Sequence, residues 1–516
     1  MTDRPNFVFF ITDQQRADWL GCYGHPVVKT PHIDAIAACG MRFENFHTAS
    51  PVCMPNRASL MTGRYPSVHG LRYNGCVLPA SANTFVDVLA EGGYRTAAIG
   101  KSHLQPFTDK PPIGRKTVET GSLAEAWKPD ASDYGHEEPG RYEADGRYVF
   151  PTPYYGFQHI DMVTVHGDRC GGHYHQWFRE TASDWQALHD DANELAHNYT
   201  CPQAYRTPIP EELYPTAYIR DRSIDYLRAQ GDAPFFLFVS FPDPHHPFNP
   251  PGRYWDMYGP DEFDLNLPYE AHRNPTPPMR WMHENWRGAG GQTTPQTAMM
   301  LDEARLREAM ALTAGMVAMV DDAVGGVMEA LRETGLIDNT VVCFNSDHGD
   351  YLGDFNMLLK GALPFRSITR VPFIWSDPAA QTGVNRALAS TVDIGATVLE
   401  RAGLAPYFGM QGESLLHVLD GGQVRDDLLI EYNDGGARLG FEAPARVRAL
   451  LTGRHRLTVY RDQDWGELYD LAEDPNETHN LWDDPGMASV KLDLSLRLNR
   501  QLTALMDESP RSQRVA

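Results

Sequence analysis

The sequence predicts an α/β protein with a doubly wound mixed sheet flanked by helices and a smaller α+β domain at the C-terminal end. Short apolar runs that end in polar residues, separated by segments of helical periodicity, indicate the large domain. After Gly421-Gly422 the pattern changes to short strand-like runs, which indicates the small one. A chain of 516 residues can bury two such cores. We therefore expect a large domain over residues 1–422 and a C-terminal α+β subdomain over residues 423–516.

Four apolar runs are predicted to be strands of the main sheet: residues 6–12, 96–99, 235–241 and 340–344. Continuous apolar character is typical of parallel strands that helices cover on both faces. Residues 309–332 have apolar side chains at helical spacing, and this predicts a long helix before the fourth strand. Polar residues follow every one of the four runs, at the strand ends where an open α/β sheet binds its ligand.

Two stretches, residues 104–213 and 247–298, are predicted to be long loops. The first is rich in Pro, Gly, Tyr, His and Trp with weak periodicity, and loops of this length commonly cover a pocket. In the C-terminal subdomain we expect strands and one helix; the strands are at 428–432, 447–451 and 456–460, and the helix is at 490–506.

Charge and composition restrict the function. A formal net charge of −23 argues against nucleic acid as a partner, because a phosphate-backbone binder needs a basic face. An anionic substrate would require a few cations inside the pocket. The first apolar run is too short for a signal peptide or a membrane span, so no membrane partner is expected. The seven cysteines are scattered along the sequence, which favours reduced thiols and a cytoplasmic protein. The exposed tail and the long loops favour a homo-oligomer.

The most informative stretch is CMPNRASLMTG at residues 53–63, which matches the pattern CxPxRxxxxTG. It resembles the signature of the formylglycine-dependent sulfatase family of the alkaline phosphatase superfamily. The resemblance implies an alkaline-phosphatase-like fold and hydrolysis of sulfate monoesters. It also implies that a formylglycine-generating enzyme converts Cys53 to formylglycine during maturation. Without the resemblance, Cys53 would be interpreted as a partly buried thiol before an ordinary helix.

Formylglycine has a chemical advantage over serine as a nucleophile. Its hydrated aldehyde has two hydroxyl groups on one carbon. One attacks sulfur, and deprotonation of the other re-forms the aldehyde and expels sulfate, so water need not attack the covalent intermediate.

Two polar pairs at strand ends are candidate metal ligands: Asp13-Gln14 and Asp347-His348. Taken alone, Asp13 could cap a helix and Asp347 could belong to a turn. The resemblance implies that both pairs, with position 53, bind one divalent cation, Ca²⁺ or Mn²⁺. Many sulfatases have Asp where Gln14 stands and Asn where His348 stands. The combination in this chain also occurs in the phosphonate monoester hydrolases of the family and in some bacterial sulfatases.

Several cationic residues occupy positions that resemble family elements. Gly100-Lys101-Ser102-His103 is similar to the GKxH element, in which Lys holds sulfuryl oxygens and His assists the second hydroxyl. Residues 244–248, PHHPF, resemble the PHxPF element and place His245 near the leaving oxygen. The predicted catalytic residues are thus Cys53, Arg57, Lys101, His103, His245 and Lys360, and the predicted substrate-binding residues are Asn74, Lys101, His245 and Lys360.

Residues 468–481 resemble the family's tail element LYDLxxDPxExxNL, so the resemblance spans the chain. The prediction is an arylsulfatase-like hydrolase of small sulfate esters that is promiscuous toward phosphonate monoesters and phosphodiesters. The alternative is a phosphonate monoester or phosphodiester hydrolase on the same scaffold. Lys101 with His103 favours sulfate, because similar phosphonate hydrolases tend to carry neutral residues there. A non-catalytic anion-binding protein is disfavoured, since every site position holds a competent residue.

Overall fold

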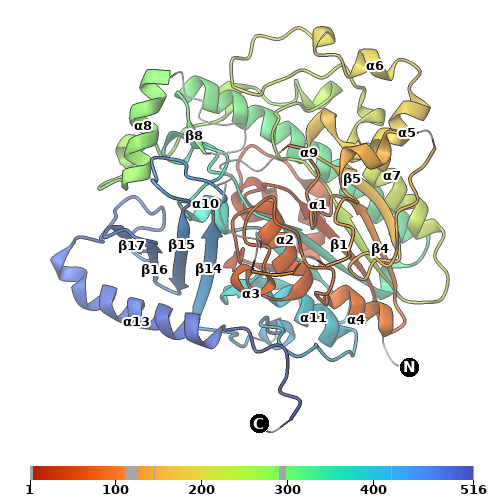
Figure 1. Cartoon of the computed structure of the whole chain (residues 1–516). Coiled ribbons are helices and arrows are strands. Elements are labelled where there is room, and N and C mark those ends of the chain that lie inside the picture. Colours follow the sequence, from red (N-terminus) through yellow and green to blue (C-terminus); the bar gives the residue numbers. More distant parts are fainter. Residues whose placement is uncertain are drawn as a thin grey trace.

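The structure is a computed structural model that describes residues 4–110, 126–128, 130–144, 146–289, 298–419 and 421–514, with residues 286–289 described by their backbone alone. Its centre is a nine-stranded sheet in the order β12-β2-β11-β9-β1-β7-β4-β5-β6 (Figure 1). The strands of this sheet are β1 (Asn6–Thr12), β2 (Met41–Phe43), β4 (Arg95–Gly100), β5 (His159–Thr164), β6 (Gly171–Gly172), β7 (Phe235–Ser240), β9 (Thr340–Ser346), β11 (Phe373–Ser376) and β12 (Gly383–Asn385).

The middle of the sheet is parallel. Strand β1 pairs with β7 on one side and β9 on the other, so that Phe9 is in register with both Phe238 and Cys343. Strand β11 is antiparallel to β9 and β2, and β6 is antiparallel to β5, which makes the sheet mixed. The four predicted strands are confirmed as β1, β4, β7 and β9.

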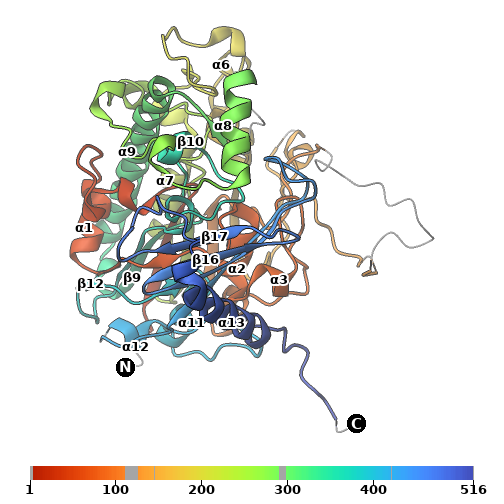
Figure 2. The ribbon, with the colours of Figure 1, turned by 90° about the vertical axis from the view of Figure 1, so that its left-hand side faces the viewer.

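Helices cover both faces of the sheet (Figures 1 and 2). Val8 and Phe10 of β1 pack in one core cluster with residues of α1, α7 and α9, while Phe7 and Phe9 pack in another with residues of α2, α4 and α11. This alternation follows from the pleat of a strand, and it explains why β1 is apolar throughout. The helices are α1 (Pro31–Ala38), α2 (Cys53–Thr62), α3 (Pro66–His69), α4 (Phe85–Glu91), α5 (His173–Thr181), α6 (Trp185–Leu188), α7 (Pro215–Arg228), α8 (Pro277–Ala289), α9 (Glu303–Glu333), α10 (Arg366–Thr369), α11 (Asp393–Arg401), α12 (Leu416–Leu419) and α13 (Ala488–Ala504).

Helix α9 confirms the predicted long helix and extends it toward the N-terminus. Asp302 caps it, because its side chain accepts a hydrogen bond from the Arg305 N–H at 3.0 Å. Among the described residues it is the one helix long and apolar enough to cross a membrane, but 89% of its most apolar window is buried inside the protein. Packing in the core therefore accounts for its apolar residues.

The prediction of a long loop over residues 104–213 is wrong for one part of that range. Strands β5 and β6 and helices α5 and α6 lie there, and β5 pairs with β4 at the side of the main sheet. The predicted loop over residues 247–298 is also wrong in part, because it contains α8. Histidine, Asp and Thr within and beside β5 interrupt its apolar run, so its periodicity is weak. Residues 111–125 and 290–297 of the two predicted loops lie outside the described residues.

The C-terminal part forms a four-stranded antiparallel sheet, β14-β15-β16-β17, with α13 against it (Figure 1). Its strands are β14 (Asp427–Asn433), β15 (Arg446–Thr452), β16 (His455–Tyr460) and β17 (Gly466–Asp470). Two further sheets have two strands each: β3 (Phe46–His47) with β13 (Ala389–Ser390), and β8 (Met299–Met300) with β10 (Met357–Leu358). The predicted C-terminal strands and helix are confirmed within a few residues.

A buried charge cluster ties the tail element to the rest of the chain. Arg456 donates to Glu467 at 2.9 Å and to Glu477 at 2.5 Å, and all three side chains are buried. The other oxygen of the Glu477 carboxylate accepts a hydrogen bond from the Arg366 N–H at 2.7 Å, at the start of α10. The tail element is thus a connection between the C-terminal sheet and the large domain.

We expect Arg456→Ala to destabilise the protein by about 3–5 kcal/mol, because it leaves two buried carboxylates without their cation. Arg454→Ala is the matched control, since Arg454 pairs with Asp470 on the surface, 60% exposed, and its loss should change stability little. Urea unfolding of both variants measures the difference. Equal midpoints would show that the buried cluster does not support the fold.

Candidate active site

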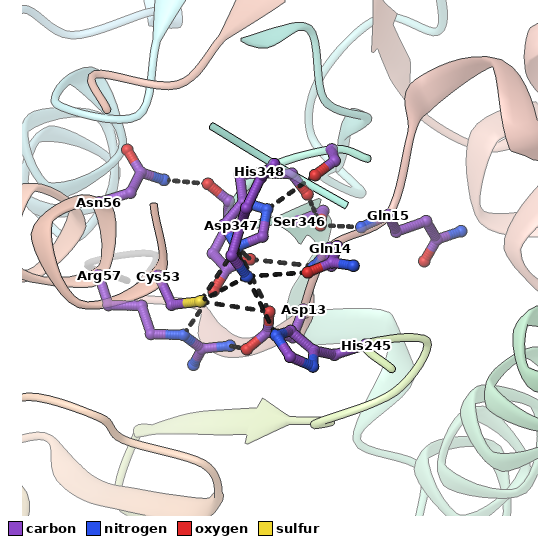
Figure 3. Close-up of polar contacts among 12 residues, drawn as sticks. Asp13, Gln14, Gln15, Cys53, Asn56, Arg57, His245, Ser346, Asp347 and His348 are labelled. Atoms are coloured by element: carbon purple, nitrogen blue, oxygen red, sulfur yellow. Dashed lines mark hydrogen bonds and ion pairs between the residues drawn. The ribbon is translucent and has the colours of Figure 1, made fainter. Parts of the chain in front are cut away.

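The predicted site residues converge at the C-terminal edge of the parallel strands. Asp13 follows β1, Lys101 follows β4, and Asp347 and His348 follow β9. Neighbouring parallel strands end at the same edge, so residues more than 300 positions apart come into contact there. Figure 3 shows Asp13, Asp347 and His348 around the thiol of Cys53.

Cys53 is the first residue of α2 and is buried. Its Sγ lies 3.0 Å from His348 Nε2, 3.2 Å from Lys360 Nζ and 3.6 Å from Asp13 Oδ1. Burial and Asp13 raise the pKa of the thiol, but the positive charges of Lys360 and His348 outweigh them, so its pKa is lowered. Position 53 is therefore one that favours an anionic oxygen or sulfur.

Four side chains form a compact group of potential metal ligands: Asp13, Cys53, Asp347 and His348. One ligand atom from each lies within 4.8 Å of the others, and all four residues are buried. The His348 ring is oriented by its Nδ1, which lies 2.8 Å from the Gly349 carbonyl oxygen, so Nε2 faces the group. The group offers two carboxylates, one imidazole nitrogen and position 53 to an ion.

Gln14 lies beside this group, and its amide oxygen faces Lys360. Its backbone is in the left-handed region, with φ 65°, and its N–H donates to Asp347 Oδ1 at 3.2 Å. Its Nε2 donates to Asp350 Oδ2 at 2.6 Å, so Oε1 points the other way and accepts from Lys360 Nζ at 2.8 Å. Asp350 was not among the predicted site residues. Its place in the polar run after β9, Asn-Ser-Asp-His-Gly-Asp, was the available signal.

Arg57 lies behind the potential ligands. Its Nε donates to Asp347 Oδ2 at 2.8 Å, and its NH2 lies 3.6 Å from Asp13 Oδ2. Its NH1 donates to the Lys101 carbonyl at 2.9 Å and to Ser240 Oγ at 2.8 Å. One buried guanidinium thus links both carboxylates to the ends of β4 and β7.

Lys101 contacts Asp13 and a histidine that sequence reasoning missed. Its Nζ donates to Asp13 Oδ2 and lies 2.6 Å from His166 Nε2. Burial and the charge of Lys101 lower the pKa of His166 to about 3, so this imidazole is a neutral acceptor at neutral pH. His166 comes two residues after β5, and the polar residue at a strand end was the signal that could have found it.

Lys360 and His245 lie together beside Cys53. The Nζ of Lys360 is 3.0 Å from His245 Nε2, and the His245 Nδ1 is 2.5 Å from the His246 carbonyl oxygen. The His245 ring stacks on His166 with a centroid distance of 3.6 Å. These contacts place one ammonium and one imidazole nitrogen beside Cys53.

His103 and Asn74 lie near this group, but in the part of the chain that the structure describes neither side chain has a hydrogen bond to Cys53. The His103 N–H donates to Glu137 at 2.8 Å, and its ring stacks on Phe107. Its Nδ1 is buried and finds no hydrogen-bond partner among the described residues. Asn74 is exposed, and its Oδ1 accepts from the Met54 N–H at 3.2 Å.

A pocket that is open to solvent leads to this site. Val52, Asn74 and Lys360 line it, together with residues 432–435 and Arg438. The end of β14 and the loop between β14 and β15 therefore contribute directly to the pocket.

The fold and the site define an alkaline-phosphatase-like α/β hydrolase. The sulfatase family profile matches residues 5–404, and the profile of the N-sulphoglucosamine sulphohydrolase C-terminal region matches residues 361–504. The chain belongs to the sulfatase family, a family of hydrolases that act on sulfate esters.

Three known proteins illustrate the relation. An arylsulfatase of Clostridium perfringens is 28% identical over 485 residues, which are 93% of this chain and 90% of that protein. The multifunctional alkaline phosphatase superfamily protein PehA of Trinickia caryophylli is 26% identical over 515 residues, covering 95% of this chain and 93% of that protein. The crystal structure of the phosphonate monoester hydrolase of Agrobacterium radiobacter has a TM-score of 0.76 and 25% identity, covering 98% of this chain and 97% of that chain.

Glu137 is the residue that holds the loop after β4, and this role can be tested. Its carboxylate accepts from the N–H groups of His103, Leu104 and Gln105 at 2.8, 3.0 and 3.2 Å. Glutamine keeps only one acceptor oxygen and turns an NH₂ group toward the donors on the other side, so amide hydrogen exchange in part of residues 103–105 should become roughly 10- to 100-fold faster in Glu137→Gln.

Glu138→Gln is the control for this experiment, because the neighbouring side chain is exposed. Hydrogen exchange followed by mass spectrometry measures both variants. Unchanged exchange in Glu137→Gln would mean that other contacts hold the loop.

Proposed function

We propose that this chain hydrolyses sulfate monoesters as an arylsulfatase-like enzyme, with a formylglycine derived from Cys53 as nucleophile. The observation that carries the proposal is the position of Cys53. It opens α2 within the CxPxR pattern, and its Sγ lies within 3.6 Å of a carboxylate, an imidazole and an ammonium. We infer that a formylglycine-generating enzyme acts on the chain during maturation.

The residues present suit a divalent metal. Asp13, Gln14, Asp347, His348 and position 53 would hold it, and the mostly oxygen donors favour Ca²⁺ or Mn²⁺. Lys101, His245 and His166 counter the effect of burial and hold the pKa of Asp13 well below its usual value, so this ligand is ionised. When bound, such an ion acts as a Lewis acid on the nucleophile and the sulfuryl oxygens.

Within this scheme Arg57 is a positioning residue. Its guanidinium fixes the Asp347 and Asp13 carboxylates from behind, at 2.8 and 3.6 Å, and does not line the pocket. Lys360 lines the pocket and lies 3.2 Å from Cys53 Sγ. We assign Lys360 and Lys101 to the non-bridging oxygens of the sulfuryl group, because they are the ammonium groups on two sides of the nucleophile position.

We assign the two proton transfers of the reaction to His245 and His103. The Nζ–Nε2 distance of 3.0 Å lets Lys360 and His245 share a proton, and we propose that this pair supplies the proton for the leaving oxygen. His103 has a buried Nδ1 with no partner among the described residues, and we propose that it accepts the proton released when sulfate is expelled. Burial and Lys101 lower the pKa of His103 well below its ordinary value, so it is a neutral base near pH 7.

The second candidate is a phosphonate monoester or phosphodiester hydrolase. This second activity is favoured by two residues, Gln14 next to Asp13 and His348 next to Asp347. It is also favoured by the TM-score of 0.76 to a phosphonate monoester hydrolase. The ammonium of Lys101 and the imidazole of His103 favour sulfate. We therefore propose sulfate esters as the preferred substrates and phosphonate monoesters as a side activity.

A substrate panel tests this proposal. Protein made with a formylglycine-generating enzyme should lose about 18 Da on the peptide that contains Cys53. It should hydrolyse at least one aryl, choline or sugar sulfate with higher kcat/KM than any phosphonate monoester or phosphodiester. Cys53→Ala should be inactive. Full activity with an unmodified Cys53 would exclude formylglycine as the nucleophile. Higher kcat/KM for a phosphonate monoester or phosphodiester than for every sulfate would favour the second candidate function.

Metal removal tests the ligand group. Chelation should abolish turnover, and elemental analysis should find about one Ca²⁺ or Mn²⁺ per wild-type chain. Asp347→Asn should lose most of the bound metal. Asp322→Asn is the control, because Asp322 belongs to a separate, partly exposed group with His32 and Asp321. Equal metal content in the two variants would place the ion elsewhere.

A further inference from the structure

Two arginines lie at or beside the active-site pocket. Arg438 lines it, and the Arg446 guanidinium lies 5.8 Å from the ring centroid of Tyr73, another lining residue. Burial lowers the pKa of Arg446, and the nearby charges of Arg461, Arg72 and Arg448 lower it further.

This cationic patch is unusual for the chain. The formal net charge is −23, so an anion approaching most of the surface is repelled. Asp434 is the one carboxylate among the residues that line the pocket. It is buried, and its oxygens already accept from Tyr432 at 3.1 Å and lie 3.4 Å from Arg438 Nε. Arg438 and Lys360 both line the pocket, and the Arg446 guanidinium lies beside Tyr73, so these cations favour an anionic ligand in the pocket.

The contacts of Arg438 orient its guanidinium. Asp434 holds it on the Nε side at 3.4 Å, and the side chain is 23% exposed, so its terminal part borders the pocket. Lys360 lines the same pocket near Cys53. A ligand that fills the pocket would thus have one anionic group at Lys360 and space for another near Arg438. Tyr73 and Tyr432 also line the pocket and would pack against a ring.

We propose that the preferred substrate is a sulfate ester whose organic part carries a second anionic group, a carboxylate or another sulfate, and that Arg438 binds this group. The inference rests on the proposed sulfate ester hydrolysis and adds the charge of the substrate to it. A guanidinium binds either oxyanion through two parallel hydrogen bonds, which fixes the orientation of the substrate. Asp434 acts as a positioning residue for Arg438.

The test compares substrates that differ in one charge. 4-Methylumbelliferyl sulfate and phenyl sulfate have neutral organic groups; 3- and 4-carboxyphenyl sulfate carry a carboxylate, and 1,3- and 1,4-phenylene disulfate carry a second sulfate. Wild-type enzyme should show a lower KM for at least one dianionic substrate than for phenyl sulfate. The carboxylate and disulfate arms show which oxyanion the pocket prefers.

Arg438→Gln should lower kcat/KM for the preferred dianion roughly 10- to 100-fold, mainly through KM, because it removes a hydrogen bond to a charged group. It should change kcat/KM for phenyl sulfate less than about 3-fold, which also shows that the variant is folded. Arg332→Gln is the matched control, since Arg332 is a half-exposed arginine of α9 paired with Glu329 at 2.9 Å and does not line the pocket. It should leave both substrates unchanged.

Two results separate this inference from the proposed function. If no sulfate ester is hydrolysed, the proposed function fails. The second anionic group is excluded if phenyl sulfate is hydrolysed but neither dianionic series is preferred. It is also excluded if Arg438→Gln affects neutral and anionic substrates equally. In both cases sulfate ester hydrolysis itself stands. Raising the ionic strength gives an independent measure, because the preference for the dianion should weaken as salt screens the partly exposed arginines.

Discussion

The site depends on one buried network in which Arg57 binds the carboxylates of Asp347 and Asp13. Two carboxylates that end neighbouring strands repel each other, and burial raises the free energy of each charge. Arg57 offsets both effects from behind, and Lys101 adds a second cation on Asp13. Because β1 and β9 pair in parallel register, the two acids cannot move apart without breaking the sheet. The protein therefore holds a concentrated set of hard ligands in a fixed place.

The same network controls the polarity of the pocket. Asp13 and Asp347 lie together, and the cations Lys101 and Lys360 contact Asp13 and Gln14. A chain with a net charge of −23 thus contains a site that attracts an anion. The interactions are strong there because the side chains are buried, and they cost little reorganisation because hydrogen bonds already fix them.

The C-terminal subdomain is part of this arrangement. The Glu431 N–H of β14 donates to the Ala49 carbonyl at 2.9 Å, just before the CxPxR segment, and the Glu431 carboxylate accepts from Ser67 at 2.7 Å. The subdomain also supplies Tyr432 and Arg438 to the pocket. The core of the large domain holds the reacting groups, and the smaller sheet borders the space that the organic part of a substrate would occupy.

Much of this could be predicted from the sequence, because local patterns encode it. Continuous apolar runs predicted β1, β4, β7 and β9, helical spacing predicted α9, and the CxPxR pattern identified the family. Residues directly after these strands, such as Asp13 and Asp347, were predictable as site residues since parallel strands share one edge.

Only the tertiary structure decided which partners each of these residues has. His166 and Asp350 belong to the site because β5 joins the sheet beside β4 and because the Asp350 carboxylate turns toward Gln14. Arg57 lies behind the carboxylates and does not line the pocket. Arg438, in the loop between β14 and β15, does line it. Sequence patterns report periodicity and chemical type over a few residues. Side-chain direction and contacts across hundreds of residues depend on packing, which no local pattern records.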